Sequence, residues 1–380
     1  MSPTQFGFRN AVGTREAIYS IQVLFQRCRD MNCSVYACFV DYKKAFDRVR
    51  HHKMIQILED IGLDGRDIRV IADLYWNQSA SVRVGNETTE ETKILRGVRQ
   101  GCILSPLLFN LYSEFIFREV LEDTELGILL NGERINNIRY SDDTLIFADS
   151  LEALQKLMDK LTASSQLYGL DINIKKTKLM IISKKYMNTG NYMGTNVNEE
   201  WDHSQEIRCR IEKARSAFGR MKNLFTSHHI ALNTKIRLLR CYVFSILFYG
   251  VESWTLTQAT TKKLEAFEMW LYRRILKISW IDHVTNREVL RRLGKNVEVV
   301  ETVKIRKLQY LGHIMRNEER FHLLQTILQG KVMGKRGVGR RRISWLKNLR
   351  TWYDVNTTEL FRAAVNKVKI ACMIANIRNG

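Results

Sequence analysis

Two adjacent aspartates stand between two runs of strand-forming residues, and this pattern constrains the fold more than any other in the chain. The runs are 135–139 and 144–148, and no glycine or proline interrupts either of them. They predict a β-hairpin with Asp142 and Asp143 at its tip. Aspartate tolerates turn backbone, so the pair can simply form a solvated turn. Alternatively, the hairpin presents oxygen ligands to a divalent cation, which requires another carboxylate from elsewhere in the chain.

Asp41 is the candidate for that other carboxylate. It follows a run of strand formers, 34–40, that is too apolar to be half exposed and therefore predicts a central strand. A charge at the end of a buried strand is costly unless it is paired or liganded. Asp41 can equally be the first exposed residue after the strand, and both interpretations stay open at this point.

A loop rich in arginine and glycine, 96–101, precedes a predicted helix. Ser105 and Pro106 suit the N-cap and first position of that helix, which would run to about Leu121. Glycines allow close backbone approach, so the loop can hold a phosphate or a base pair at the helix N-terminus. A plain connector would explain the glycines but not the arginines or Gln100.

The remaining patterns predict a mixed first half and a helical second half. Thr14 is expected to cap the first helix, and a hairpin is expected around Gly85-Asn86. A lysine-rich run, 170–179, alternates like an edge strand. Helices are expected over about 15–30, 48–62, 64–76, 151–167, 204–226, 232–249, 258–278, 285–293 and 300–315.

Positive charge is concentrated in the second half of the chain. Residues 1–200 carry 25 Lys and Arg against 26 Asp and Glu, a net charge of −1, whereas residues 201–380 carry 35 against 14, a net charge of +21. Such an excess indicates a polyanion-binding half, most simply one that binds nucleic acid. The basic stretch 331–350, with Trp345 and the nearby Trp352, suits backbone contact combined with base stacking. A solvated basic surface is the alternative.

Composition excludes several classes of protein. The 380 residues are 45% hydrophobic and 26% charged, as in ordinary globular proteins. No apolar run reaches about 18 residues and no signal-peptide pattern is present, so no membrane association is expected. Seven scattered cysteines without a C-x-x-C motif favour a reduced, intracellular chain without structural zinc.

Taken in order, these segments resemble the palm of a reverse transcriptase from a LINE-type (non-long-terminal-repeat) retrotransposon. The motifs that carry the resemblance are Gln5-Phe6-Gly7-Phe8-Arg9 for motif 2, 39–47 for motif A, 96–106 for motif B, 140–143 for motif C, 169–178 for motif D, and Tyr192-Met193-Gly194 for the primer grip. Residues 249–256 and the segment around Trp345 are similar to the tail of such elements. The resemblance therefore covers nearly the whole chain.

This resemblance implies an α+β fold: a right-hand polymerase palm with partial fingers, then an all-α thumb and a basic helical C-terminal region. The expected parts are 1–33 (residual fingers), 34–200 (palm), 201–255 (thumb) and 256–380 (C-terminal region). The family polymerase has fingers strands before motif 2, and many such elements encode an endonuclease upstream. The chain is therefore expected to be a fragment of such an element.

The resemblance also implies RNA-directed DNA polymerisation, with an RNA template, a DNA primer or target and dNTPs as partners, and no protein partner is evident. Asp41, Asp142 and Asp143 would be the catalytic carboxylates and would bind two Mg²⁺ ions, with Mn²⁺ as a substitute. The other expected contacts to nucleotide or template are Phe46 as the steric gate against a 2′-hydroxyl, Gln100, Gly101, Arg9, and either Lys176 or Lys178.

Two other functions stay open. The chain can be a catalytically inactive, nucleic-acid-binding remnant of such an element, which the expected absence of the fingers favours and the intact carboxylates oppose. A palm repurposed to bind a protein is the other, although no feature of the sequence favours it. The protein is expected to be intracellular and, if active, to work in the nucleus; where an inactive protein would reside stays open.

Overall fold

A computed structural model of the protein describes residues 1–121, 124–183, 189–193, 195–198, 203–296, 298–336 and 343–379. The chain forms two compact units. The first unit comprises Met1–Ala17, Arg27–Met193 and Gly330–Arg336, and the second comprises Ile18–Gln26, Gly194–Gln329 and Gly337–Gly380. Helix α1 (Thr14–Asp30) contributes residues to both. Within the described ranges, no helix is both long and apolar enough to span a bilayer.

The first unit is built on a four-stranded sheet with the strand order β10-β1-β9-β8. Strand β1 (Val35–Val40) is flanked by β10 (Lys178–Ile182) and β9 (Asp143–Ala148), and both pair with it in antiparallel fashion. Strand β8 (Asn137–Tyr140) forms a hairpin with β9. Almost every residue of β1 is buried, as its apolar composition predicted for a central strand. The predicted hairpin with two aspartates at its tip is confirmed.

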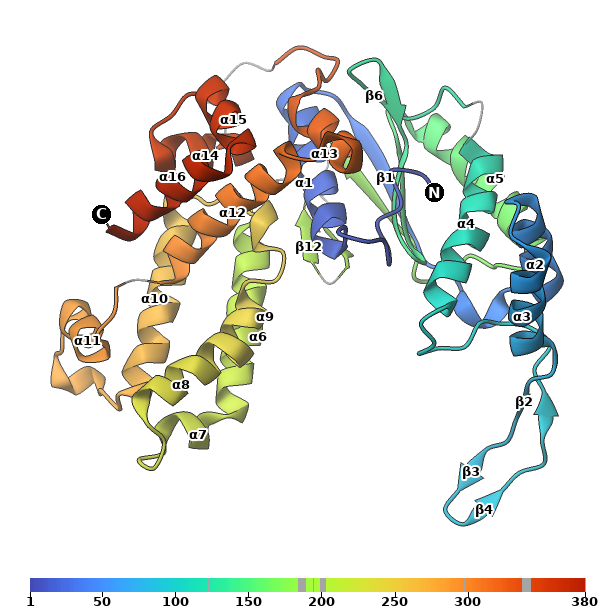
Figure 1. The fold of residues 1–380 in the computed structure, drawn as a ribbon. Coiled ribbons are helices and arrows are strands. Elements are labelled where there is room, and N and C mark those ends of the chain that lie inside the picture. The colour runs from blue at the N-terminus through green and yellow to red at the C-terminus, as the bar shows by residue number, and fades with distance from the viewer. Residues whose placement is uncertain are drawn as a thin grey trace. The chain divides into compact units, whose positions relative to one another are not determined.

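Four helices belong to the first unit with this sheet (Figure 1). They are α2 (His51–Asp60), α3 (Gly65–Trp76), α4 (Ser105–Leu121) and α5 (Leu151–Leu167), close to the ranges expected from periodicity. Helices α2 and α3 lie on the far side of α4 from the sheet. The apolar faces of the four helices share one hydrophobic core with β1 and β9, because the residues at helical spacing point the same way. Its members include Met54, Leu58, Tyr75, Phe109, Tyr112, Ile146, Leu154, Leu157 and Leu161.

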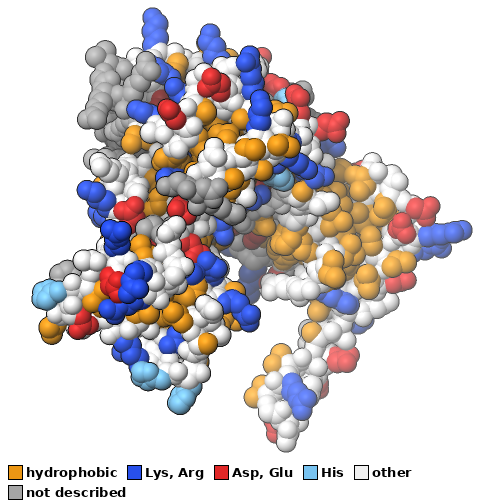
Figure 2. Space-filling model, turned by 60° about the vertical axis from the view of Figure 1, so that its left-hand side comes forward, with side chains coloured by type: hydrophobic (Ala, Val, Ile, Leu, Met, Phe, Trp, Pro, Cys, Tyr) orange, Lys and Arg blue, Asp and Glu red, His pale blue; other side chains and the backbone are white. Residues whose placement is uncertain are grey.

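A narrow two-stranded arm follows α3 (Figure 1). Strand β2 (Ser79–Ala80) pairs with β5 (Thr92–Lys93), and β3 (Arg83–Val84) pairs with β4 (Glu87–Thr88). The predicted hairpin around Gly85-Asn86 is therefore confirmed. Every residue from 79 to 93 is exposed, and Figure 2 shows the arm as a thin projection.

Short strands complete the first unit and open the second. Strands β6 (Ile128–Leu130) and β7 (Glu133–Ile135) form a further hairpin. Strand β11 spans Thr189–Tyr192 and β12 spans Thr195–Asn198. Of the expected primer-grip motif, Tyr192 ends β11 and Gly194 lies outside the described residues.

The prediction of one strand over 170–179 was wrong for most of that range. The amide of Asn173 donates to the carbonyl oxygen of Asp41 at 2.7 Å, and the amides of Lys176 and Thr177 donate to the carbonyl oxygen of Asn173. These bonds close a turn and remove the segment from the sheet, so β10 begins only at Lys178. The alternating pattern of residues 170–179, which predicted a strand, belongs mostly to a solvated turn whose basic side chains point outward.

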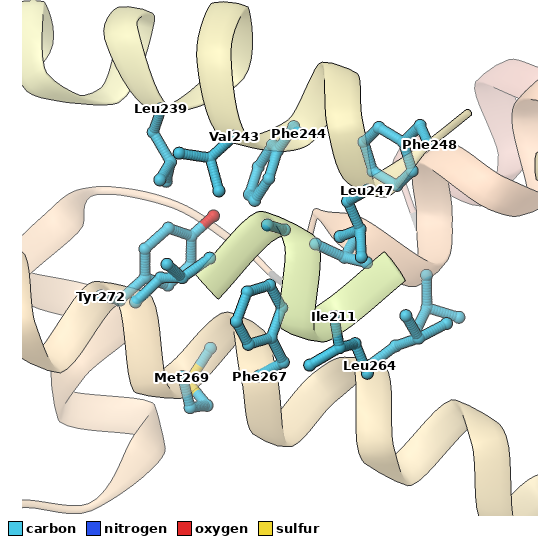
Figure 3. Close-up of a cluster of buried hydrophobic side chains, with 14 of the residues drawn as sticks. Ile211, Leu239, Val243, Phe244, Leu247, Phe248, Leu264, Phe267, Met269 and Tyr272 are labelled. Atoms are coloured by element: carbon cyan, nitrogen blue, oxygen red, sulfur yellow. The ribbon is translucent and has the colours of Figure 1, made fainter. Parts of the chain in front are cut away.

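The second unit is helical, as the periodicity from residue 204 predicted. Its helices are α6 (Ser204–Arg220), α7 (Lys222–Thr226), α8 (Leu232–Leu238), α9 (Ser245–Leu247), α10 (Gln258–Ile275), α11 (Asn286–Leu293), α12 (Val299–Met315), α13 (Glu318–Gln329), α14 (Trp345–Tyr353), α15 (Thr357–Val365) and α16 (Lys367–Asn379). A π-helical segment, Leu239–Phe244, joins α8 to α9. Aliphatic and aromatic side chains of α6, α10 and the π-helical segment interdigitate in its core, where Figure 3 shows Ile211, Phe244 and Phe267.

Two local expectations at the ends of the chain need correction. The N-cap of α1 is Gly13, and Thr14 is the first helical residue, because the Glu16 side chain accepts a hydrogen bond from the Gly13 amide. Trp345, expected to stack on bases, is only 2% exposed. Its ring packs edge-on against Tyr19 and its indole N–H donates to the carbonyl oxygen of Glu252, so it is a core residue.

Candidate active site

Strand register brings the three aspartates to one edge of the sheet. Val40 is opposite Thr144 in the β1–β9 pair, and Tyr140 is opposite Asp143 in the hairpin. Since the strands are antiparallel, Asp41, which directly follows Val40, reaches the level of Asp143. Asp142 lies in the turn beside it. The sheet thereby joins carboxylates that are about 100 residues apart in the sequence.

The three carboxylates influence one another electrostatically. Loss of surrounding water raises the pKa of Asp143 to about 6, and the charges of Asp142 and Asp41 add to that rise. Burial also raises the pKa of Asp142, with a further contribution from Asp41. Like charges gathered at one edge are unfavourable unless a cation or a proton offsets them. The cluster therefore has the electrostatics of a cation site.

One oxygen of this cluster has no hydrogen-bond partner. Oδ2 of Asp41 is buried and accepts no hydrogen bond in the described part of the chain, and the ammonium of Lys176 lies 3.9 Å from it. This long ion pair leaves the hydrogen-bonding capacity of Oδ2 unused, so the atom suits a closer cationic ligand. Among the described residues, however, no three His, Cys, Asp or Glu side chains converge closely enough to form a ready-made metal cage. The residue types at this edge nevertheless fit a divalent ion, because carboxylate oxygens are the ligands that such ions prefer.

The N-terminal segment holds the turn of the hairpin in place. The buried side chain of Gln5 accepts hydrogen bonds through Oε1 from the amide of Ser141 at 3.0 Å and from the amide of Gly7 at 2.8 Å. Ser141 has a positive φ of 58°, which a non-glycine residue adopts only where its surroundings require it. A Cβ atom at Gly7 would lie 2.4 Å from the amide nitrogen of Ser141. Glycine is therefore required at position 7 by this close approach.

Backbone pairing reinforces that support. The amide of Phe6 donates to the carbonyl oxygen of Arg139 at 2.8 Å, and the amide of Arg139 donates to the carbonyl oxygen of Thr4 at 2.9 Å. The guanidinium of Arg139 is buried and forms an ion pair with Glu114 at 3.0 Å. The end of the hairpin next to the turn is thus held by a buried polar network. Sequence reasoning named Gln5 only as part of a motif and did not identify its structural role.

The expected sugar gate lies where motif A meets motif B. The ring of Phe46 stacks on Phe109 with centroids 4.5 Å apart, and its carbonyl oxygen accepts the amide of Val98. Gly97 has a φ of 100° and packs against the backbone of Asp47, which leaves no room for a side chain. Phe46 is thus anchored by its neighbours on one face. Its role as the gate stays a prediction.

The remaining expected site residues take several positions. The side chain of Gln100 donates to Asp47 at 3.2 Å, and Gly101 is exposed with a positive φ. Arg9 donates to the carbonyl oxygens of Ser2 and Gln5, so it orders the N-terminal loop. The two motif D lysines differ: Lys176 faces Asp41, whereas Lys178 begins β10 opposite Phe39.

Comparison with known families agrees with this geometry. Residues 1–200 match the family described as "Reverse transcriptase (RNA-dependent DNA polymerase)", which is more than half of the chain. The chain belongs to the reverse transcriptase family. The mixed sheet-and-helix first unit and the helical second unit of this reverse transcriptase are those expected of a palm and a thumb, and the predicted α+β fold class is confirmed.

Relatives of this reverse transcriptase come from non-LTR retrotransposons, which confirms the LINE-type resemblance. It is 30% identical over 172 residues to a "Retrovirus-related Pol polyprotein from type-1 retrotransposable element R2" of Nasonia vitripennis, covering 45% of this chain and 17% of that protein. It is 20% identical over 314 residues to the "RNA-directed DNA polymerase from mobile element jockey" of Drosophila melanogaster, covering 76% and 33%. The chain therefore spans a third or less of either relative.

Other similar proteins differ in length and kind. A "Putative uncharacterized transposon-derived protein" of Caenorhabditis elegans is 27% identical over 242 residues, covering 58% of this chain and 86% of its own length. Among solved structures, a telomerase from Candida tropicalis is 18% identical with a TM-score of 0.42, covering 85% of this chain and 53% of its own.

Proposed function

We propose that this reverse transcriptase is an RNA-directed DNA polymerase that extends a DNA primer with dNTPs along an RNA template. The observation that carries the proposal is the register that sets Asp41 level with the Asp142-Asp143 turn. Catalysis of phosphoryl transfer requires a protein mainly to position the reacting groups and to stabilise charge. The aspartates at this edge of the sheet can do both. Two divalent ions, Mg²⁺ or Mn²⁺, would supply charge neutralisation for the attacking and leaving oxygens when bound.

The chain's own residues have separable roles in this proposal. Asp41 and Asp142 hold the cations, and Asp143 contributes negative charge at the same edge. Lys176 is the better candidate of the two motif D lysines to meet the leaving phosphate, because its ammonium already lies near Asp41. Phe46 bounds the sugar, while Gln100 and Gly101 contact the incoming nucleotide and the template base.

Nucleic acid is the proposed partner of the basic half as well. Residues 201–380 carry a net charge of +21 and follow the proposed palm, so template and primer contacts are expected there. We retain the division into residual fingers (1–33), palm (34–200), thumb (201–255) and basic C-terminal region (256–380). An active protein would work in the nucleus, which localisation of a tagged chain would test.

Primer extension on a primed RNA template in Mg²⁺ tests this function. Any extension by the 380-residue chain should be lost in Asp41→Asn and Asp142→Ala and retained in Asp73→Ala, which removes an exposed carboxylate from α3. Nucleic-acid binding without any extension, in Mg²⁺ or Mn²⁺, would instead establish the inactive remnant. Equal extension by the wild type and by Asp142→Ala would overturn the assignment of the site.

A further inference from the structure

A second site lies in the first unit, apart from the aspartates. A cavity of about 340 Å³ is bounded by the N-terminus of α2, the end of α3 and the segment between the arm and Gly97. Its lining residues are Arg50, His51, His52, Trp76, Ile94, Leu95 and Arg96. Four of these seven are basic or imidazole side chains, and none is acidic. A volume of this size accommodates one nucleotide.

The N-terminus of α2 has an unusual distribution of charge. Its N-cap is Arg50, which provides no side-chain hydrogen bond to the helix, and its first turn contains no acidic residue. His51, His52 and Lys53 follow directly. The amide groups at a helix N-terminus already carry partial positive charge, so basic residues there are unfavourable unless an anion is bound. This arrangement is explained if α2 holds a phosphate.

A second arginine reaches the same place from another segment. Arg50 and Arg96 are paired across an antiparallel β-bridge, which brings two arginines together at the cavity. The Arg50 guanidinium donates a hydrogen bond to the carbonyl oxygen of Leu167 at 3.4 Å. Within the described part of the chain, the Arg96 side chain has no hydrogen bond or ion pair. Its guanidinium is therefore available to a phosphate group.

The remaining lining is aromatic and aliphatic, and it is open to solvent. Trp76 is 50% exposed and Leu95 is 80% exposed. The ring of His51 lies 5.9 Å from that of Trp76, and its Nε2–H donates a hydrogen bond to the carbonyl oxygen of Gly97 at 2.8 Å. An exposed indole beside cations is the pairing that single-stranded nucleic acid uses, since every base has a face to stack.

We propose that this cavity binds one nucleotide of a single-stranded nucleic acid, with its phosphate at Arg96 and the N-terminus of α2 and its base on Trp76. The strand passes the cavity with an unpaired base, so a duplex is excluded. His51 ties the cavity to Gly97, which packs against the backbone of Asp47, the residue after Phe46. The proposal concerns binding and does not depend on polymerase activity.

Photocrosslinking with a single-stranded oligonucleotide of about 12 nucleotides containing 5-iodouridine tests the site on the full chain. After irradiation and proteolysis, mass spectrometry identifies the attached peptides. We expect a crosslink at Trp76 or His52, because iodouracil reacts with aromatic rings on which it stacks. Local mapping is needed since the basic half would dominate any overall affinity.

Four variants sharpen the test. Arg96→Ser should lower the crosslink at Trp76 about tenfold, the order expected from losing a phosphate contact, while crosslinks elsewhere persist. Arg69→Ser, on the exposed face of α3, should leave the yield unchanged. Trp76→Phe should retain a crosslink because the stacking face remains, and Trp76→Ala should lose it.

Competition identifies the source of the nucleotide. An unlabelled single strand should compete at micromolar concentration, whereas uridine monophosphate, inorganic phosphate and a duplex should not. Equal competition by uridine monophosphate would overturn the proposal in favour of a mononucleotide site. The proposal would also be overturned if no residue that lines the cavity were crosslinked. A crosslink yield that Arg96→Ser left unchanged would overturn it as well. Thermal unfolding of each variant shows whether its fold is retained.

Discussion

Oε1 of Gln5 lies 3.0 Å from the amide nitrogen of Ser141, 136 residues further along the chain. Ser141 is the residue with positive φ that directly precedes Asp142. The same oxygen accepts the amide of Gly7, so one buried side chain fixes both the entry loop and the hairpin turn. By holding the Ser141 amide, Gln5 fixes the backbone direction at Asp142. Gln5 is therefore a positioning residue for the Asp142 carboxylate.

Gln5→Leu should therefore disturb the aspartates without touching them. Two buried amides would lose their acceptor, at a cost of about 1–3 kcal/mol each in an unrelaxed structure. We expect faster hydrogen exchange at the Ser141 amide and a fall in kcat that exceeds any change in KM. Gln5→Glu, which keeps the acceptor, should recover part of kcat. Unchanged exchange at Ser141 would contradict this role, whether or not the chain polymerises.

Gly7→Ala should destabilise the first unit. Its methyl group would lie 2.4 Å from the backbone nitrogen of Ser141, and neither backbone can move away cheaply. Overpacking of this kind costs about 1–3 kcal/mol. Gly219→Ala is the matched control: nothing lies within 4 Å of its added Cβ, and alanine favours helix. Chemical denaturation should show loss of stability in the first variant and none in the second.

Phe46→Val should relax sugar discrimination if Phe46 is the gate. The smaller side chain leaves room for a 2′-hydroxyl, so incorporation of ribonucleotides relative to deoxyribonucleotides should rise. Phe109→Leu is a useful companion, because it removes the ring on which Phe46 stacks but leaves the gate itself in place. A ratio unaffected by Phe46→Val would show that another residue excludes the hydroxyl.

Lys307 predicts a pH-dependent stability of the second unit. It is fully buried, and its Nζ donates to the carbonyl oxygen of Trp254 and to Oδ1 of Asn348. Burial drives the pKa of Lys307 well below its ordinary value. The unfolded chain then binds more protons than the folded chain between the two pKa values. The contribution of Lys307 to stability therefore rises with pH in that window and is lost as pH falls through the folded pKa.

Lys307→Met removes this titration. The free energy of unfolding of the wild type, minus that of Lys307→Met, should increase as the pH is raised towards 10. Lys262→Met, at an exposed position of α10, should show little change with pH. Denaturation at several pH values provides the measurement, and a difference independent of pH would mean that Lys307 titrates normally.

Binding of single-stranded nucleic acid to the full chain should weaken steeply with salt. Each phosphate neutralised releases counterions, and residues 201–380 offer 35 Lys and Arg against 14 Asp and Glu. A plot of log affinity against log salt concentration should be linear with a slope of several units. An affinity insensitive to salt would leave the positive charge of this half without a role in binding.

The sequence alone determined the elements with strong local signals. Apolar spacing predicted α1 and α5 to within a few residues, and Ser105 and Pro106 marked the start of α4. Strand formers on either side of Asp142 and Asp143 predicted the hairpin. These features depend on residues within one helix turn or one strand pair. The order of the motifs then identified the family, because residue types and their spacing can be read from a sequence without knowledge of the contacts that they form.

Tertiary structure decided which residues meet. Gln5 supports Ser141, Lys176 rather than Lys178 faces Asp41, and Trp345 is buried on Tyr19. Arg50 and Arg96 gather at the cavity by a bridge between distant segments. A local pattern records which face of an element is apolar, but not which distant segment covers it, because register and packing are set by free energy summed over the whole core.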